Sequence, residues 1–295
     1  MMQFNSTQEE TSPLGHLGSG IRERNCTGLL LANEIRKGLH TRVFGKQGIA
    51  YFKQTDSTNL RAKELAEGYA PEGTLVVAEK QTSGRGRKGR SWFSPAGDGI
   101  YASLILRPAM SANQAPRITL MTAVAVAETL FSLTQLPARI KWPNDILVNG
   151  KKIAGILTEI SVKMDSIAYV VVGVGVNVNT PPDGFPQEIK GKATSILVES
   201  GEPFPRADII RAFLKCYETH YEMLRESGFK PIIKRWKELT DVIGQRVTVD
   251  VIGKQYCGKV IDVDDTGVLI VEDSHGRSHR FYSGDLNLDL GLAQE

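Results

Sequence analysis

Apolar residues recur along this chain with two different periods. Short segments rich in β-branched residues predict strands, whereas apolar residues at every third or fourth position predict helices. The predicted strands cover residues 49–52, 74–79, 100–107, 152–160 and 166–179, with a strand, a turn and a second strand over 138–148. The predicted helices cover residues 29–39, 60–68, 118–133, 206–226 and 229–239. Because these elements do not follow a strict β-α-β order, we predict an α+β fold with a mixed or antiparallel sheet.

The two ends of the chain have different patterns. Beyond residue 241, four short alternating segments (QRVTVDVIG, CGKVIDVD, GVLIVED and RSHRFYSGDL) are separated by Gly and Asp turns, which predicts a small all-β barrel. Residues 1–28 are polar and contain no apolar pattern that could support a core. We therefore divide the chain into a disordered polar tail (1–28), a linker helix (29–48), a main α+β domain (49–241) and a barrel domain (242–295).

Composition is that of an ordinary globular protein. Of the 295 residues, 41% are hydrophobic and 23% are charged, and no uninterrupted apolar run approaches the length of about 18 that spans a membrane. Cys26, Cys216 and Cys257 form neither a CxxC pair nor a Cys/His group at zinc spacing, which favours a reducing compartment and a cytoplasmic protein. The net charge of +3 is too small to indicate a positive potential over the whole surface that would attract nucleic acid, so any basic site has to be local.

Such a local site lies in residues 84–90, GRGRKGR, which combine three glycines with four cations. Glycines let the backbone fold tightly and point its N–H groups at an anion, and arginine offers a planar donor fork for carboxylate or phosphate. Trp92 and Phe93 follow and would cover a bound ligand. The loop therefore predicts anion capture, and a solvated basic loop or a nonspecific nucleic-acid patch is the alternative. It is not a Walker loop, because GxxxxGK[ST] is absent.

Two lysine-containing segments could also hold a ligand. In KWPND (141–145), Pro143 fixes a turn between two apolar strands and holds the polar pair after it at a strand end, although Asn-Asp after Pro is also ordinary turn chemistry. Lys152 opens the next predicted strand. A lysine there more often lies at the solvent-facing end of a hairpin.

Glycine and hydroxyl residues supply two weaker signals. Glycine weakens a strand, so Gly173 and Gly175 suggest that a flat group approaches the backbone closely at these positions. Close sheet packing or a bulge is the alternative explanation. DSTN (56–59) is, taken alone, an ordinary helix cap through Ser57 or Thr58.

Taken together and in order, these motifs resemble the catalytic domain of the biotin protein ligases. The matching segments are DSTN (56–59), GRGRKGR (84–90) followed by WFSP (92–95), KWPND (141–145), KKIAGIL (151–157) and GVGVNVN (173–179), and YSGDL (282–286) resembles the end of that family's SH3-like domain. The resemblance implies a mixed-sheet catalytic domain of the biotin/lipoate ligase type with a C-terminal SH3-like β-barrel. It also implies a two-step reaction, in which biotin and MgATP give biotinyl-5′-AMP and a carrier lysine then takes the biotinyl group.

The resemblance further implies roles for the matching residues. Three residues would be catalytic: Lys152, Arg85 and Arg87. The two arginines would bind the biotin carboxylate and the α-phosphate, and the lysine would stabilise the pentavalent phosphorus. The biotin site would comprise Ser57, Thr58, Asn59, Gln81, Arg85, Gly86, Arg87, Lys152 and Gly155. The ATP site would comprise Arg87, Arg90, Trp92, Lys141, Asn144, Asp145 and Asn177, with Asn177 reading adenine. Asp145 would contact Mg²⁺.

The implied partner is the biotin carboxyl carrier protein domain of acetyl-CoA carboxylase or of another carboxylase, and a homodimer is a family-level expectation. Many bacterial relatives carry an N-terminal DNA-binding domain, for which the segment before Leu29 is too short and too polar. We therefore expect no specific DNA binding. A lipoate-type acyl-adenylate ligase and a non-catalytic basic-loop nucleic-acid binder remain alternatives, although GRGRKGR and the KWPND spacing favour biotin over lipoate.

Overall fold

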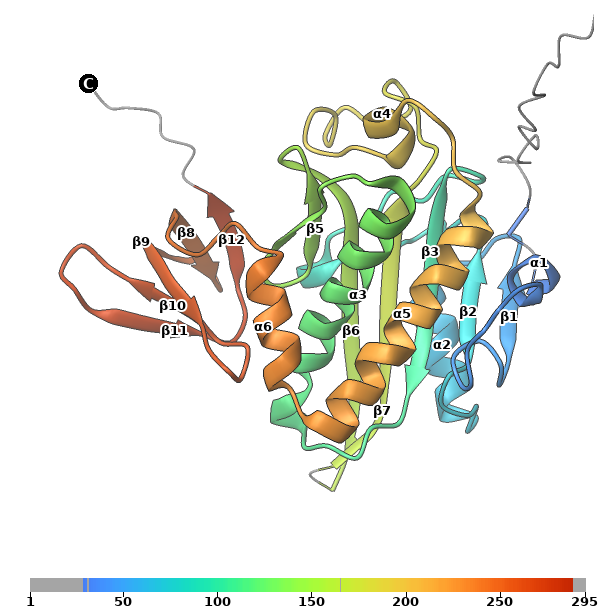
Figure 1. Cartoon of the computed structure of the whole chain (residues 1–295), viewed down its shortest axis with the longest axis horizontal. Helices are drawn as coiled ribbons and strands as arrows, with labels where there is room; N and C mark the ends of the chain where they lie inside the picture. Colours follow the sequence, from blue (N-terminus) through green and yellow to red (C-terminus); the bar gives the residue numbers. More distant parts are fainter. Residues whose placement is uncertain (1–28, 31, 165, 289–295) are drawn as a thin grey trace, which may run out of the picture.

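The computed structural model of the protein describes residues 29–30, 32–164 and 166–288 (Figure 1). The polar tail predicted for residues 1–28, with Cys26, lies outside the described residues. The described part forms a main domain with a central sheet and a smaller C-terminal β domain beside it (Figure 1).

The main domain is built on a seven-stranded sheet with the order β1-β2-β3-β7-β6-β5-β4. Its strands are β1 (Ile49–Phe52), β2 (Leu75–Ala78), β3 (Gly99–Leu106), β4 (Arg139–Lys141), β5 (Asp145–Val148), β6 (Lys151–Lys163) and β7 (Ser166–Asn177). β1 and β2 pair in parallel and the other neighbours pair antiparallel, so the sheet is mixed, as predicted. The predicted turn between β5 and β6 is present, with positive φ at Asn149 and Gly150.

Helices cover both faces of this sheet (Figure 1). The helices α3 (Pro116–Thr134), α5 (Arg206–Ser227) and α6 (Lys230–Glu238) lie on one face, and α2 (Thr58–Glu67) lies on the other. Successive strand residues point to opposite faces, so Val77 and Leu104 pack in the large core beneath α3 and α5, whereas Val76 and Ile105 pack in a smaller core beneath α2. This arrangement matches the predicted α+β class.

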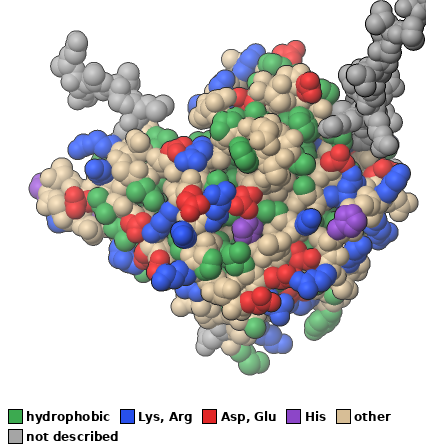
Figure 2. Space-filling model, in the orientation of Figure 1, with side chains coloured by type: hydrophobic (Ala, Val, Ile, Leu, Met, Phe, Trp, Pro, Cys, Tyr) green, Lys and Arg blue, Asp and Glu red, His purple; other side chains and the backbone are tan. Residues whose placement is uncertain are grey.

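The long helix α3 is apolar because it is a core helix. With the short 3₁₀ turn η2 (Ala112–Gln114) before it, the segment Ala112–Thr134 is long and apolar enough to cross a membrane by length and composition, and 61% of its most apolar window is buried inside the protein. The helical face outside this core carries acidic and basic side chains side by side (Figure 2). Such mixing of signs agrees with the small net charge.

The linker segment differs from its prediction. Helix α1 covers only Ala32–Arg36, and the chain turns at Gly38, whose φ is +82°. The residues up to 48 are irregular and are held by hydrogen bonds to the main domain, because the Glu218 carboxylate accepts the backbone N–H groups of Arg42 and Val43, each at 2.7 Å. The helix predicted over 29–39 is therefore too long, since the helix ends at Arg36 and the chain turns at Gly38, which has a positive φ.

The C-terminal domain is an antiparallel sheet in the order β11-β10-β9-β8-β12. Its strands are β8 (Arg246–Val251), β9 (Lys254–Val263), β10 (Leu269–Glu272), β11 (Ser278–Phe281) and β12 (Asp285–Leu288). Four strands were predicted, and the structure has five because the last segment divides into β11, which pairs with β10, and β12, which pairs with β8. Trp142 Nε1 donates to the carbonyl of Gly267 at 3.3 Å, so the buried KWPND turn contacts this domain.

A titratable cluster joins the three helices on one face of the sheet. The Glu128 carboxylate on α3 lies 2.7 Å from His220 Nε2 on α5 and 2.7 Å from Arg235 Nε on α6. The hydrogen bond from His220, followed by that from Arg235, lowers the pKa of Glu128 to about 2 against the opposing effect of burial. A depressed folded-state pKa stabilises the protein above the unfolded value of about 4.5, and this stability is lost as the pH falls toward 2.

We therefore expect Glu128→Gln to lower the free energy of unfolding by about 2 kcal/mol at pH 7, with the difference from wild type shrinking as the pH falls from 5 to 3. Urea denaturation at several pH values measures this effect. Glu238→Gln is the control, because Glu238 pairs with the same Arg235 at 2.8 Å but is half-exposed, and its effect should stay below about 0.5 kcal/mol. A pH-independent difference for Glu128→Gln would contradict the assignment.

Candidate active site

One cavity of about 620 Å³ lies between the end of the main sheet, loop 84–90 and the C-terminal domain. Every site residue predicted from the sequence lines it: Ser57, Thr58, Asn59, Gln81, Arg85, Gly86, Arg87, Arg90, Trp92, Lys141, Asn144, Asp145, Lys152, Gly155 and Asn177. The structure thus brings together motifs that are up to 120 positions apart in the chain, counted from Ser57 to Asn177. Their individual roles are considered under the proposed function.

The floor of the cavity is formed by glycines of β6 and β7. Gly155 and Gly175 face one another in the strand register, and the indole of Trp92 lies on both. A Cβ atom would lie 2.9 Å from the Trp92 ring at Gly155 and 2.4 Å from it at Gly175, so only glycine leaves room for the indole. Of the two alternate glycines singled out in the sequence, Gly175 therefore admits a flat group, the Trp92 ring, whereas Gly173 packs closely against Asn59, which is the alternative of close packing. Any ligand ring that reaches the same surface has to displace the indole.

A polar wall is formed at the start of α2. Ser57 occupies the N-cap position with an extended backbone, but its hydroxyl does not cap the helix, so the predicted capping role of Ser57 or Thr58 is wrong. Instead, Thr58 donates its N–H and its hydroxyl to Gln81 Oε1 at 2.8 and 3.2 Å. Gln81 in turn donates to Ser94 at 2.8 Å. The Ser57 hydroxyl is left facing the cavity, where a ligand can use it.

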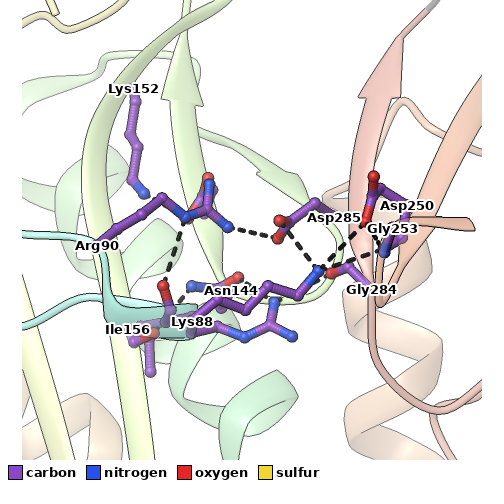
Figure 3. Close-up of polar contacts among 11 residues, drawn as sticks. Lys88, Arg90, Asn144, Lys152, Ile156, Asp250, Gly253, Gly284 and Asp285 are labelled. Atoms are coloured by element: carbon purple, nitrogen blue, oxygen red, sulfur yellow. Dashed lines mark hydrogen bonds and ion pairs between the residues drawn. The ribbon is translucent and has the colours of Figure 1, made fainter.

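The basic loop folds back on itself and reaches the C-terminal domain. It contains a 3₁₀ turn, η1 (Arg87–Gly89), in which Lys88 and Gly89 have positive φ. Arg90 pairs with Asp285 at 2.6 Å, and Lys88 pairs with the same carboxylate at 3.2 Å (Figure 3). Asp285 begins β12 and also lines the cavity. The C-terminal domain therefore forms one wall of the site.

Arg87 lies deeper than the other cations of the loop. Its guanidinium donates to Asn144 Oδ1 at 2.9 Å and to the carbonyl of Gly284 at 3.3 Å. Burial lowers the pKa of Arg87, although an arginine remains charged at neutral pH. Asn144 is itself fixed, because its Nδ2 donates to the carbonyl of Ile156 at 2.9 Å. A cation held this way is positioned before any ligand arrives.

These ion pairs predict that Asp285 restrains the loop. Two partly exposed pairs contribute about 0.5–1 kcal/mol each, so Asp285→Ala should raise the rate of trypsin cleavage within residues 84–90 about fivefold. Timed digestion with mass spectrometry of the fragments measures this rate. Asp262→Ala is the control, since Asp262 pairs with Lys237 at 2.7 Å in the same domain but away from the loop. Equal cleavage of both variants would show that the ion pairs do not hold the loop.

Two lysines and a carboxylate lie close to these loop cations, since Asp145 acts on Arg87 and Arg90 acts on Lys141. Lys152 Nζ is 2.6 Å from Asp145 Oδ1 and 5.3 Å from the centre of the Trp92 ring. Burial lowers the pKa of Lys141, and the neighbouring Asp145 opposes that shift. Asn177 is buried and donates to the carbonyl of Thr194 at 2.9 Å. Positive charge is thus concentrated in this part of the cavity around two carboxylates, Asp145 and Asp285.

Asp145 suits a magnesium ion that is bound mainly through substrate phosphates. Mg²⁺ keeps several waters and commonly takes only one or two protein carboxylates in such sites. The Asp145 carboxylate lines the cavity beside Lys141 and Lys152, where phosphate groups would be attracted. The residues present therefore fit this ion.

The sequence analysis missed several residues that build the cavity. These are Tyr101 and Ala102 of β3, Pro186, Glu188, Ile189, Lys192 and Ala193 in the connection after β7, and Asp285, Leu286 and Asn287 of β12. The connection is brought to the site because Lys152 and Ala193 form a parallel bridge. No local pattern marks these residues, since their place follows from strand pairing and domain contact.

Comparisons with known proteins agree with this geometry. A model of the biotin/lipoate A/B protein ligase family matches residues 51–177, and a model of the biotin protein ligase C-terminal domain matches residues 242–286. The chain is 43% identical over 269 residues to the bifunctional ligase/repressor BirA of Bacillus subtilis, covering 91% of this chain and 82% of that protein. It is 34% identical over 227 residues to the biotin–[acetyl-CoA-carboxylase] ligase of Paracoccus denitrificans, covering 76% and 94%.

A solved structure gives the same result. The biotin protein ligase from Aquifex aeolicus in complex with biotin and ATP matches with a TM-score of 0.70 and 30% sequence identity, covering 82% of this chain and 98% of that one. The cavity and the sheet that carries it are therefore those of an enzyme of the biotin/lipoate ligase class. Within that class, the C-terminal match and the similar relatives show that the chain belongs to the biotin protein ligase family.

Proposed function

We propose that this chain is a biotin–[acetyl-CoA-carboxylase] ligase that uses the cavity for both steps of its reaction. Biotin and ATP give biotinyl-5′-AMP and pyrophosphate, and the biotinyl group then passes to a lysine of the biotin carboxyl carrier protein. The observation that carries the proposal is that Arg87, Lys141 and Lys152 converge on one cavity that the neutral hydrogen-bonding groups of Ser57, Thr58 and Gln81 also line. Such a site suits a ligand that has an uncharged polar group at one end and a carboxylate at the other, where the carboxylate reacts with a phosphate group.

In the first step, a carboxylate oxygen of biotin attacks the α-phosphorus of ATP, and the bond to pyrophosphate breaks. Both reactants are anions, so they repel one another unless cations lie between them. Arg85 and Arg87 are assigned to the biotin carboxylate and the α-phosphate, and Lys152 to the charge that develops on the phosphorus. Ser57, Thr58 and Gln81 would hydrogen-bond the ureido ring, and Gly86 and Gly155 would let the backbone approach biotin.

The nucleotide is assigned to the end of the cavity near KWPND. Lys141 and Arg90 would contact phosphate groups, Asn177 the adenine ring, and Trp92 would cover the adenylate after leaving the glycine floor. Mg²⁺ would neutralise phosphate charge beside Asp145. Asn144 holds Arg87 in place through the hydrogen bond at 2.9 Å.

In the second step, the amine of the acceptor lysine attacks the carbonyl carbon of the mixed anhydride, and AMP leaves with the bonding electrons. Lys152 would stabilise the leaving phosphate, so the same charge serves both steps. No covalent bond to this protein forms. A loop that covers the adenylate would also keep water from hydrolysing it.

Release of pyrophosphate from ATP tests this proposal. Release should follow the addition of biotin, should not follow lipoate, and should be succeeded by biotin transfer to the purified carrier domain. Release with lipoate instead would favour a lipoate-type ligase. If neither acid causes release while RNA or DNA binds tightly, the nucleic-acid alternative holds.

We also propose that the protein acts in the cytoplasm, where its acceptor carboxylase is made, and that it does not bind DNA specifically. The relative from Bacillus subtilis is named a ligase and repressor, so this expectation needs its own experiment. Filter binding or gel-shift assays at physiological salt, with and without biotin and ATP, would detect operator binding. Sedimentation under the same conditions reports whether a homodimer forms.

A further inference from the structure

The buried side chain of Asn59 makes three hydrogen bonds within the protein. Its Oδ1 accepts the Ser103 hydroxyl at 2.7 Å, and its Nδ2 donates to the carbonyl of Leu157 at 3.2 Å and to Glu159 Oε2 at 2.8 Å. Both amide protons are therefore used. Asn59 is thus better suited to positioning its neighbours than to donating to the ureido group of a ligand.

The other oxygen of Glu159 is directed to the basic loop. Glu159 Oε1 lies 3.1 Å from the guanidinium of Arg85, so one carboxylate connects the start of α2 to loop 84–90. Both side chains are partly exposed, at 43% for Arg85 and 32% for Glu159. At that exposure the pair contributes little to stability, and its main consequence is orientation.

The strand places Glu159 where it can act on the ligand through Arg85. Alternate residues of a strand share a face, and Gly155 and Leu157, which precede Glu159 on the same face of β6, both line the cavity. The strand register is regular through these positions, since the irregularity begins only at Ser161. Glu159 therefore lies at the end of the cavity face, behind Arg85.

We propose that Glu159 is a positioning residue that aims the guanidinium of Arg85 at the carboxylate of biotin and so sets the preference for an ionised carboxylate. A guanidinium is planar, so an ion pair at one terminal nitrogen restrains the direction of the remaining donors. Glu159 binds one nitrogen and leaves the others for the ligand. This inference rests on the proposed function, because it takes biotin as the ligand.

Calorimetric binding of biotin and of biotin methyl ester tests the inference. The wild-type protein should prefer biotin, and Glu159→Gln should lower that preference about tenfold by weakening the binding of biotin alone. Gln is close in size and keeps an acceptor for Asn59, so the fold should persist, as unchanged affinity for the ester would confirm. In the Arg85→Ala background, Glu159→Gln should have no further effect on either ligand.

Three results would overturn the inference. If Glu159→Gln lowered the affinities for biotin and for its methyl ester equally, Glu159 would be a structural residue that acts through Asn59. If the variant bound biotin more tightly, Glu159 would compete with the ligand for Arg85. If the effects of Glu159→Gln and Arg85→Ala were additive, Glu159 would not act through Arg85. Glu64→Gln is the control, because Glu64 pairs with Arg61 at 2.6 Å on the exposed side of α2 and should leave both affinities unchanged. If the wild-type protein bound neither ligand, the proposed function itself would fail.

Discussion

Replacing Lys152 by alanine is expected to lower the rate of biotinyl-5′-AMP formation about 10²- to 10³-fold, the usual effect of removing one preorganised charge from a transition state. The Lys152 ammonium is held 2.6 Å from Asp145 and lies over the Trp92 ring, so its position is set before substrates bind. Single-turnover release of pyrophosphate from ATP and biotin measures the effect. Transfer from added biotinyl-5′-AMP should slow as well, because the same charge would stabilise the departing AMP.

The fold should tolerate this substitution. The Lys152 side chain is 33% exposed, and a partly exposed ion pair contributes at most about 1 kcal/mol to stability. Lys151→Ala is the matched control, since Lys151 is the preceding residue of β6, is exposed and does not line the cavity. We expect normal adenylation from Lys151→Ala. A normal rate from Lys152→Ala as well would refute the catalytic assignment.

The resemblance of the ordered motifs to the biotin protein ligases supplied the predicted site residues, and strand pairing brings all of them to one cavity. KWPND lies at the turn between β4 and β5, Lys152 is the second residue of β6, and DSTN leads into α2. Hydrophobic periodicity predicted α3 and α5 to within two residues at each end, since long buried helices leave a strong pattern. The short linker helix was predicted less well, because its apolar pattern continues to Leu39 whereas the helix ends at Arg36, before the turn at Gly38.

Contacts between distant segments could not be predicted in the same way. Asp285 lies 195 residues after Arg90, and their 2.6 Å ion pair exists only because β12 pairs with β8 beside the loop. Glu159 carries no signal of its own, since a glutamate on a partly exposed strand is ordinary. The side-chain placement of Trp92 was also open, because the glycines at 173 and 175 predicted close approach of a flat group but did not show that Trp92 would lie on Gly175 and Gly155. Which residues contact one another at these positions is decided by the tertiary structure and not by the local sequence.

The same reasoning about close approach gives a second large effect at Gly173. A Cβ atom at this position would lie 2.1 Å from Asn59 Oδ1, which is far inside van der Waals contact. Asn59 cannot move aside without breaking its hydrogen bonds to Ser103, Leu157 and Glu159. We expect Gly173→Ala to lower the free energy of unfolding by about 2–4 kcal/mol, from overpacking and from buried polar groups left without partners.

Biotin affinity should fall at least about 100-fold in the same variant, because the displaced Asn59 no longer fixes the start of α2 or Glu159. Urea denaturation and calorimetry measure the two effects separately. Gly48→Ala is the control, since its nearest neighbour would be 3.8 Å from the new Cβ atom, and both properties should be retained. Adding Asn59→Ala to Gly173→Ala removes the clash and should restore the part of the stability lost to overpacking, but not the affinity. If the double variant bound biotin normally, Gly173 would matter only for packing and Asn59 would have no part in shaping the site.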